Sequence, residues 1–165
     1  GCSGASVTAS QVAGASRIPI ISPSSTSPTL SDGRAYPYFL RTIPSDSFSA
    51  VAMVDILCTY WNYSSVALVH STDTYGAGGA DAIARTSLTK GLSISTTQSF
   101  LKDSTDYSSQ QRALLQVGSQ IIVLFCQSSD GARFIRSSYE VGLGGAGYLW
   151  FGGDTLATQG FWNDD

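Results

Sequence analysis

Five side chains in this sequence carry oxygen groups of the kinds that hold the two charges of an α-amino acid. Three are the hydroxyls of Ser6, Ser24 and Thr26, and two are the carboxylates of Asp46 and Asp154. Hydroxyls and backbone amides suit a ligand carboxylate, whereas carboxylates suit an ammonium group. Serine-rich loops are also common for other reasons, and an Asp after two glycines can simply be a turn residue, so both interpretations stay open.

The segment around residues 18–46 would have to position these groups. A short apolar strand at residues 18–21 opens into a run rich in Ser, Pro and Thr at residues 22–34, which predicts irregular backbone. An aromatic segment follows and leads to a helix start at Ser45 and Asp46. A chain that lines one strand end with hydroxyls and then crosses to a new α/β repeat builds one wall of a cleft between two lobes. The predicted boundary lies at residues 40–44.

The rest of the chain alternates helical and strand patterns. Segments with apolar residues at helical spacing alternate with short apolar runs typical of strands. Ser45 and Ser129 are predicted N-caps, and Gly91 and Gly118 are predicted to end helices. Helices are expected at residues 8–16, 45–60, 75–90, 107–117 and 129–141, and strands at 18–21, 66–69, 92–100, 121–125 and 148–151. This order predicts a doubly wound α/β fold with parallel sheets, in which ligands bind outside the carboxyl ends of the strands.

Composition excludes several classes of protein. The chain has 165 residues, of which 13% are charged, and a net charge of −3, so it is expected to be globular without the basic surface that a nucleic acid would need. No apolar run reaches the roughly 18 to 20 residues that span a bilayer. The sequence starts at Gly1 without an initiator Met or a signal peptide, which suggests a piece whose targeting signal lies outside it.

Enzyme-like motifs are present but lie in the wrong context. The GxGxxG string at residues 142–147 follows a predicted helix and precedes a strand, the reverse of a dinucleotide site, and indicates a loop. The start Tyr75-Gly76-Ala77-Gly78 follows a strand and could face an anion, although many helices begin with glycine. His70 has no nucleophile in a recognisable elbow and is expected to be structural. A non-enzymatic protein with no cofactor is therefore expected.

The three cysteines and one tripeptide bear on the cellular compartment. Cys2, Cys58 and Cys126 form no CxxC pair, and the last two are expected to be buried apolar groups. Cys2 could pair with a cysteine outside this sequence. The tripeptide that begins at Asn62 matches an N-glycosylation sequon in a predicted helix-to-strand connection, so Asn62 is a glycosylation candidate if the chain is secreted.

At these same positions the sequence resembles the extracellular Venus-flytrap domain of class C G-protein-coupled receptors, within the receptor ligand-binding family of type 1 periplasmic-binding fold. Metabotropic glutamate receptors are the most similar in the binding motifs, and type B GABA receptors share the beginning and the end. The resemblance covers the whole chain through these motifs: Gly1-Cys2-Ser3 with Ser6-Val7, Ile18-Pro19, Ser24-Ser25-Thr26-Ser27-Pro28 with Leu30-Ser31-Asp32, Tyr38-Phe39-Leu40-Arg41 with Pro44-Ser45-Asp46, Ala52-Met53-Val54-Asp55-Ile56, Trp61-Asn62-Tyr63, Tyr75-Gly76, and residues 150–154.

The resemblance implies roles for six residues. Ser6, Ser24 and Thr26 would hold a ligand carboxylate, and Thr26 would join three others around its ammonium, namely Asp46, Tyr75 and Asp154. Two departures bear on the second lobe: the spacing before Tyr75 is one residue longer than expected, and glycines replace a more polar helix start at residues 77–79.

The resemblance also implies an architecture and a setting. Residues 1–41 would be the C-terminal part of lobe one, residues 42–152 lobe two, and residues 153–165 the start of a crossing back. A small ligand would close this incomplete clamshell on the outside of the plasma membrane, in a receptor dimer whose transmembrane region lies elsewhere. A periplasmic solute-binding protein of an amino-acid transporter and a guanylate-cyclase-type receptor ectodomain are the alternatives.

Overall fold

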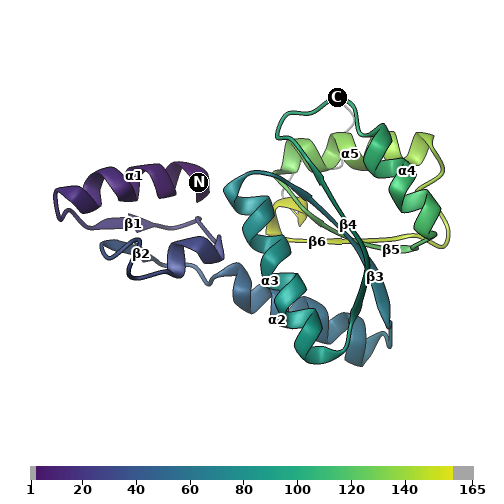
Figure 1. Ribbon diagram of the computed structural model, residues 1–165, viewed down its shortest axis with the longest axis horizontal. Helices are drawn as coiled ribbons and strands as arrows, with labels where there is room; N and C mark the ends of the chain where they lie inside the picture. The colour runs from purple at the N-terminus through teal and green to yellow at the C-terminus, as the bar shows by residue number, and fades with distance from the viewer. Residues whose placement is uncertain (1–2, 158–165) are drawn as a thin grey trace.

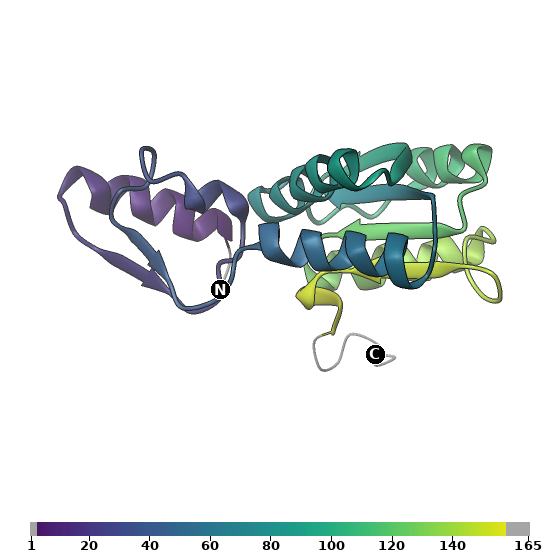
Figure 2. The same cartoon turned by 90° about the horizontal axis from the view of Figure 1, so that it is seen from below.

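The computed structural model describes residues 3–157, which form two α/β units joined by one crossing of the chain (Figure 1). The N-terminal unit, residues 3–41, contains helix α1 (Ser3–Ala15), strands β1 (Ile20–Ser22) and β2 (Phe39–Arg41), and a 3-10 turn, η1 (Pro28–Ser31). Its two strands pair in parallel. Figure 2 shows the two units side by side, with α1 and the crossing segment both reaching toward the larger one.

The C-terminal unit, residues 46–157, is a four-stranded sheet with helices on both faces. All pairings are parallel and the strand order is β4-β3-β5-β6. The elements in chain order are α2 (Asp46–Asp55), the π-helical turn η2 (Ile56–Tyr60), β3 (Ser65–Ser71), α3 (Thr74–Lys90), β4 (Ser93–Phe100), α4 (Ser108–Val117), β5 (Ile121–Phe125), α5 (Ser128–Glu140), β6 (Leu149–Gly152) and the 3-10 turn η3 (Asp154–Ala157).

The central strands are buried on both faces because successive side chains alternate. Val66 and Leu68 of β3 pack with α2 and α3, whereas Ala67 and Val69 face the cluster built by α4 and α5. β5 behaves in the same way, and its continuous apolar run has no exposed residue. The doubly wound parallel fold that the alternating pattern predicts is therefore confirmed.

Most of the predicted start and stop signals act as expected. The Ser45 side chain accepts a hydrogen bond from the Ser47 N–H at the start of α2. Gly91 and Gly118 end α3 and α4 in the left-handed region, with φ values of 76° and 66°, where a side chain would be strained.

Several element boundaries differ from the sequence-based expectations. Helix α1 begins at Ser3 rather than near Thr8, whose hydroxyl donates to the Gly4 carbonyl inside the helix instead of capping it. Strand β2 was expected only as an aromatic segment, and it pairs with β1 through backbone groups that the side-chain pattern does not report. Helix α5 begins at Ser128, so Ser129 lies inside it and is not the N-cap.

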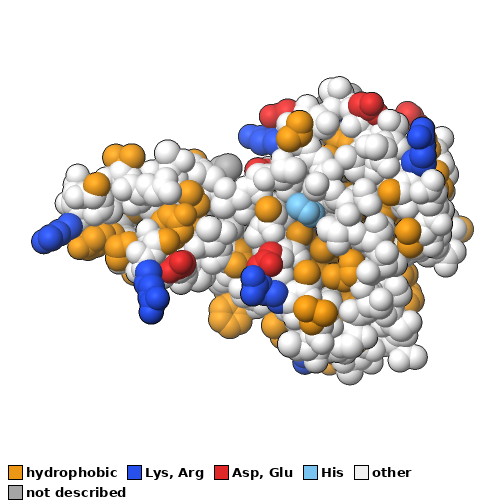
Figure 3. All heavy atoms as spheres, in the orientation of Figure 1, with side chains coloured by type: hydrophobic (Ala, Val, Ile, Leu, Met, Phe, Trp, Pro, Cys, Tyr) orange, Lys and Arg blue, Asp and Glu red, His pale blue; other side chains and the backbone are white. Residues whose placement is uncertain are grey.

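The surface has few charges. On the face in Figure 3, Lys and Arg side chains lie scattered over both units among Asp and Glu, and they form no broad basic surface there. Hydrophobic side chains gather on the N-terminal unit, where Val12, Ile18, Ile21 and Leu40 are exposed. Within residues 3–157, every helix is too short or too polar to cross a membrane.

Removal of one buried ring tests the core that holds β5 and β6 in place. Phe134 is fully buried, stacks on Phe100 at 5.2 Å, and meets Tyr107 and Trp150 edge to face. We expect Phe134→Ala to lower the free energy of unfolding by about 3 to 5 kcal/mol, measured by urea denaturation. Leu88→Ala, at an 86% exposed helical site, is the control and should change it by less than about 0.5 kcal/mol. Equal effects from the two changes would contradict this description of the core.

Candidate functional site

A cleft of about 240 Å³ lies between the two units and collects most of the predicted binding residues. It is bounded by the loop after β1 on one side and by the carboxyl ends of β3, β5 and β6 on the other. Four of the six predicted residues line it: Ser24, Thr26, Tyr75 and Asp154. Four further residues complete the lining: Ser3, Gln127, Ser128 and Thr155. The site therefore lies where a parallel sheet is expected to hold a ligand.

Tyr75 is held rigidly on the wall formed by the C-terminal unit. The Asp73 carboxylate caps α3 by accepting from the N–H groups of Tyr75 and Gly76, at 2.8 and 2.9 Å. The Tyr75 ring is 3% exposed and packs on Phe125. Burial raises the pKa of the phenol above its usual value, so its hydroxyl stays protonated at neutral pH.

A hydrogen-bond chain joins Tyr75 to the two strand ends beside it. Its hydroxyl donates to Asp154 Oδ1 at 2.8 Å and lies 3.3 Å from Thr155 Oγ1. Thr155 in turn donates to the Cys126 carbonyl at 2.7 Å. A Cβ atom at Gly153 would lie 2.6 Å from the Tyr75 hydroxyl, so only glycine leaves room for this contact. Asp154 is thereby fixed at the cleft wall with its charge held by a neutral donor.

On the other wall, Arg41 organises the hydroxyl loop. Its guanidinium Nη1 donates to three successive carbonyl oxygens, those of residues 25–27, at 3.3, 3.1 and 3.0 Å. Ser22 accepts from the Ser24 and Ser25 N–H groups at the start of the same loop. The Thr26 N–H makes no hydrogen bond within residues 3–157. The loop thus turns its carbonyls toward Arg41, while Thr26 itself lines the cleft.

Two predicted residues lie behind this wall rather than on it. The Ser6 hydroxyl is 2.8 Å from the Ser25 hydroxyl, so Ser6 supports the loop from α1. Asp46 opens α2 and is 2% exposed, and its N–H donates to the Thr26 carbonyl at 2.9 Å. Its Oδ2 atom is buried without a partner in the described part of the chain. The structure places Asp46 directly behind Thr26.

The surroundings of Asp46 disfavour its charged form. Burial is the largest effect and raises the pKa of this carboxyl above its ordinary value, and the nearby Asp154 carboxylate raises it further. The hydrogen bond from the Thr26 side chain and the Arg41 guanidinium lower the pKa only in part. Arg41 is only a partial counter-charge, because its donors already serve the loop carbonyls. A cation in the cleft would therefore be attracted by both carboxylates.

The remaining sequence candidates do not form a reactive centre. His70 places Nδ1 at 2.9 Å from the Ser71 carbonyl. Cys126 is a fully buried free thiol with a raised pKa, as expected, whereas the free thiol of Cys58 is only partly buried against the core. The GxGxxG string at residues 142–147 connects α5 to β6. Cys2 lies outside the described residues. Within those residues, no cluster of metal-ligating side chains occurs.

Sequence reasoning missed the residues that position the site. Arg41 belongs to one of the family motifs, but its partners are main-chain carbonyls, which no side-chain pattern reports. Asp73 is the real N-cap of α3, two residues before Tyr75. The polar residues Gln127 and Ser128 follow β5, and this strand-end position is the signal that could have identified them.

Comparison with known proteins defines the class of this chain. The receptor family ligand-binding region matches residues 1–163, nearly the whole sequence, so the chain belongs to that family. Together with the parallel α/β fold, the match confirms the resemblance to ligand-binding domains of class C G-protein-coupled receptors.

Metabotropic glutamate receptors are among its curated relatives. A probable receptor of this type from Caenorhabditis elegans, mgl-1, is 36% identical over 132 residues, which is 75% of this chain and 13% of the relative. The Drosophila melanogaster receptor is 32% identical over 76% of the chain and 13% of its own length. Human metabotropic glutamate receptor 8 is 30% identical over 87% of this chain and 16% of its own length. The chain thus spans about a sixth or less of these relatives.

Asp46 gives the site a pH signature. Its pKa is higher in the folded than in the unfolded chain, so the folded state binds the proton more tightly, and stability rises as pH falls from neutrality toward the ordinary carboxyl pKa of about 3.9. We expect Asp46→Asn to remove this contribution in thermal melts recorded across pH. The opposite sign is expected for the exposed Asp106, whose pKa is lowered by the Ser108 N–H and which Asp106→Asn would test. Identical pH profiles for the wild type and Asp46→Asn would contradict the assignment.

Proposed function

We propose that this chain is part of the extracellular ligand-binding domain of a membrane receptor, which binds a small amino-acid-like ligand in the cleft and signals by closing around it. The observation that carries this proposal is the convergence of Ser24 and Thr26 from one unit with Tyr75 and Asp154 from the other on a single cleft of about 240 Å³. That volume suits the head group of an amino acid and is below the usual range for drug-sized ligands.

Each end of an amino-acid head would find its complement in the cleft. The ligand carboxylate accepts from the Ser24 hydroxyl and the Thr26 N–H, with Ser6 acting through Ser25, and the oxygen of the Thr26 hydroxyl, whose proton goes to Asp46, accepts from the ammonium. The ammonium lies toward Asp154 and the Tyr75 hydroxyl, with Asp46 behind Thr26 as a further negative charge. Binding a cation here would relieve the unfavourable burial of the Asp46 carboxylate. The names of the relatives make glutamate the first candidate.

We assign the two units to the two lobes of a clamshell. Residues 1–41 belong to lobe one, residues 42–152 to lobe two, and residues 153–165 begin the crossing back. The incomplete state of lobe one is supported by its sheet of only two strands, which is marginal by itself, and by its exposed apolar residues Val12, Ile18 and Leu40. Further strands and helices would cover these residues in the complete lobe.

Signalling follows from the way the cleft is divided between the lobes. A ligand that contacts both walls binds the closed arrangement more tightly than the open one, and this difference shifts the population toward closure. In a receptor dimer the closure is passed to a transmembrane region outside this sequence. The cycle involves no chemical turnover.

Ligand binding can be tested by thermal shift with the complete ectodomain and a panel of the common amino acids and GABA. A specific ligand at a hundredfold excess over its Kd stabilises the protein by about 2.7 kcal/mol. We expect a shift with at least one compound, and its loss in Thr26→Ala and Asp154→Ala. Thr105→Ala and Asp81→Ala change exposed residues outside the cleft and should keep it. If no compound shifts the melt, the amino-acid ligand is wrong.

We also propose that Asn62 is glycosylated. It lies in the exposed loop between η2 and β3, with a φ of 55° that Asn tolerates better than most residues. This loop is at the amino end of β3, whereas the cleft is at the carboxyl end, so a glycan there would leave ligand access free.

Secretion from eukaryotic cells tests the modification. Treatment with an N-glycanase should reduce the mass of the peptide that contains Asn62 and should convert Asn62 to Asp, as measured by mass spectrometry. Asn62→Gln and Ser64→Ala should both abolish the glycan because each destroys the sequon. Ser65→Ala changes the neighbouring exposed serine outside the sequon and should keep it. An unmodified wild-type peptide would refute the proposal.

A further inference from the structure

Besides the cleft, the two lobes touch at a second place, between the hydroxyl loop and the start of α3. The Ser27 side chain donates to the Thr74 carbonyl at 3.0 Å, across 47 residues of sequence. Ser27 is fully buried, and its own N–H is held by the Ser3 hydroxyl at 3.3 Å. A buried hydroxyl donating to a helix-terminal main-chain group is an ordered contact rather than a chance surface encounter.

Gly78 allows the lobes to approach this closely. A Cβ atom at Gly78 would lie 2.6 Å from the Ser27 hydroxyl and 3.2 Å from Pro28 Cδ, so any side chain there would press against lobe one. The neighbouring glycines serve a different purpose, because Gly76 and Gly79 face Ser71 and the Phe125 ring inside lobe two. The glycine-rich start of α3, which departs from the family pattern, thus has one position directed at the other lobe.

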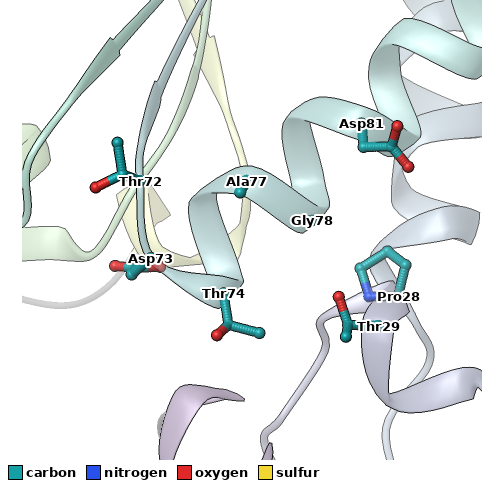
Figure 4. A pocket seen from close by; sticks show the side chains of 8 residues that line it. All are labelled: Pro28, Thr29, Thr72, Asp73, Thr74, Ala77, Gly78 and Asp81. Carbon is teal, nitrogen blue, oxygen red and sulfur yellow. The ribbon is translucent and has the colours of Figure 1, made fainter. Parts of the chain in front are cut away.

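The contact is narrow, with open space on both sides. The ligand cleft lies on one flank, and a groove of about 500 Å³ between η1 and α3 lies on the other. Figure 4 shows Pro28 and Thr29 of η1 facing Thr74 and Gly78 of α3 across this groove. Because the cleft and the groove separate the two units on either flank, the direct packing between the loop and α3 here is formed by four residues, Ser27, Pro28, Thr74 and Gly78.

We propose that Ser27 and Pro28 of lobe one and Thr74 and Gly78 of lobe two form a clasp that holds the lobes together without ligand. None of these four residues lines the ligand cleft, so the clasp adds to closure independently of what the cleft contains. It sets the population of the closed state in the empty receptor and thereby the affinity that any ligand shows. This inference rests on the proposed two-lobe closure but not on the identity of the ligand.

A disulfide can detect the clasp directly. A Cβ at position 78 would lie 3.7 Å from the Ser27 Cβ, close to the 3.8 Å mean of natural disulfides. The S27C/G78C double variant of the complete ectodomain, without ligand, is treated with a mild oxidant, and the peptide joined through positions 27 and 78 is quantified by mass spectrometry. We expect cross-linking on the order of tenfold faster than in G14C/G78C, because Gly14 has no neighbour within 4 Å.

The outcomes separate the clasp from the ligand proposal. Cross-linking at the control rate, with and without the amino-acid panel, would show that the contact does not form. Cross-linking that appears only with a compound of the panel would show that closure follows the ligand, and would overturn the clasp while favouring the binding proposal. Fast cross-linking without ligand supports the clasp even if no amino acid binds.

A second measurement does not depend on cysteine chemistry. Gly78→Leu places a bulky side chain against Ser27 and Pro28, and we expect a larger radius of gyration by small-angle scattering of the ligand-free ectodomain. Gly14→Leu makes the matched change in another helix where nothing lies nearby and should leave the radius unchanged. An unchanged radius in folded Gly78→Leu, verified by circular dichroism, would contradict a clasp that holds the lobes closed.

Discussion

The grip of Arg41 on three successive carbonyl oxygens is the interaction on which the binding wall depends. A loop rich in Ser, Pro and Thr has no regular ladder to satisfy its backbone, and buried carbonyl groups need partners. One guanidinium group satisfies the carbonyls of residues 25–27 together. With those oxygens held by Arg41, Thr26 lines the cleft, and its N–H makes no hydrogen bond within residues 3–157. Strand β2, which carries Arg41, therefore matters more for the site than its three residues suggest.

The opposite wall has a complementary organisation, since it is built from strand ends and not from a loop. Parallel strands bring the residues that follow them to one edge, and β3, β5 and β6 each supply polar groups there. The Asp73 cap and the Phe125 ring hold Tyr75, which holds Asp154 in turn. The buried, incompletely satisfied Asp46 lies behind the other wall. A buried carboxylate without a full set of partners lowers stability, and under the proposed function the ligand ammonium would compensate it.

The sequence predicted the C-terminal unit well because its strands are buried on both faces. Continuous apolar runs such as residues 121–125, together with cap residues such as Ser45 and Gly91, are local signals that tertiary contacts here reinforce. Strand β2 and the start of α1 were harder to predict. The three-residue strand β2 is specified by its pairing with β1, and the position of Ser3 is specified by its hydrogen bond with Ser27. These are contacts over long sequence distances that periodicity does not contain.

The residue types of the site could be predicted from the sequence, but not which of these residues line the cleft and which lie behind its wall. Spacing and resemblance selected Ser24, Thr26, Tyr75 and Asp154, and all four line one cleft. They did not distinguish residues that line the cleft from residues that support it, such as Ser6, because that distinction depends on which hydroxyl turns toward Ser25. Nor did they reveal Arg41 as the centre of the loop, since its partners are backbone atoms that every sequence possesses.

The glycine at position 78 has a consequence for how such a receptor can diversify. Where the lobes meet, α3 contributes a backbone carbonyl and a bare Cα, so the docking geometry there is defined mainly by main-chain atoms. Side chains on the cleft walls can then be exchanged without changing this main-chain docking. Helix α3 presents Tyr75 to the cleft and Thr74 and Gly78 to the other unit, so under the proposed function a lineage can alter its ligand selectivity while it keeps the docking of the two units.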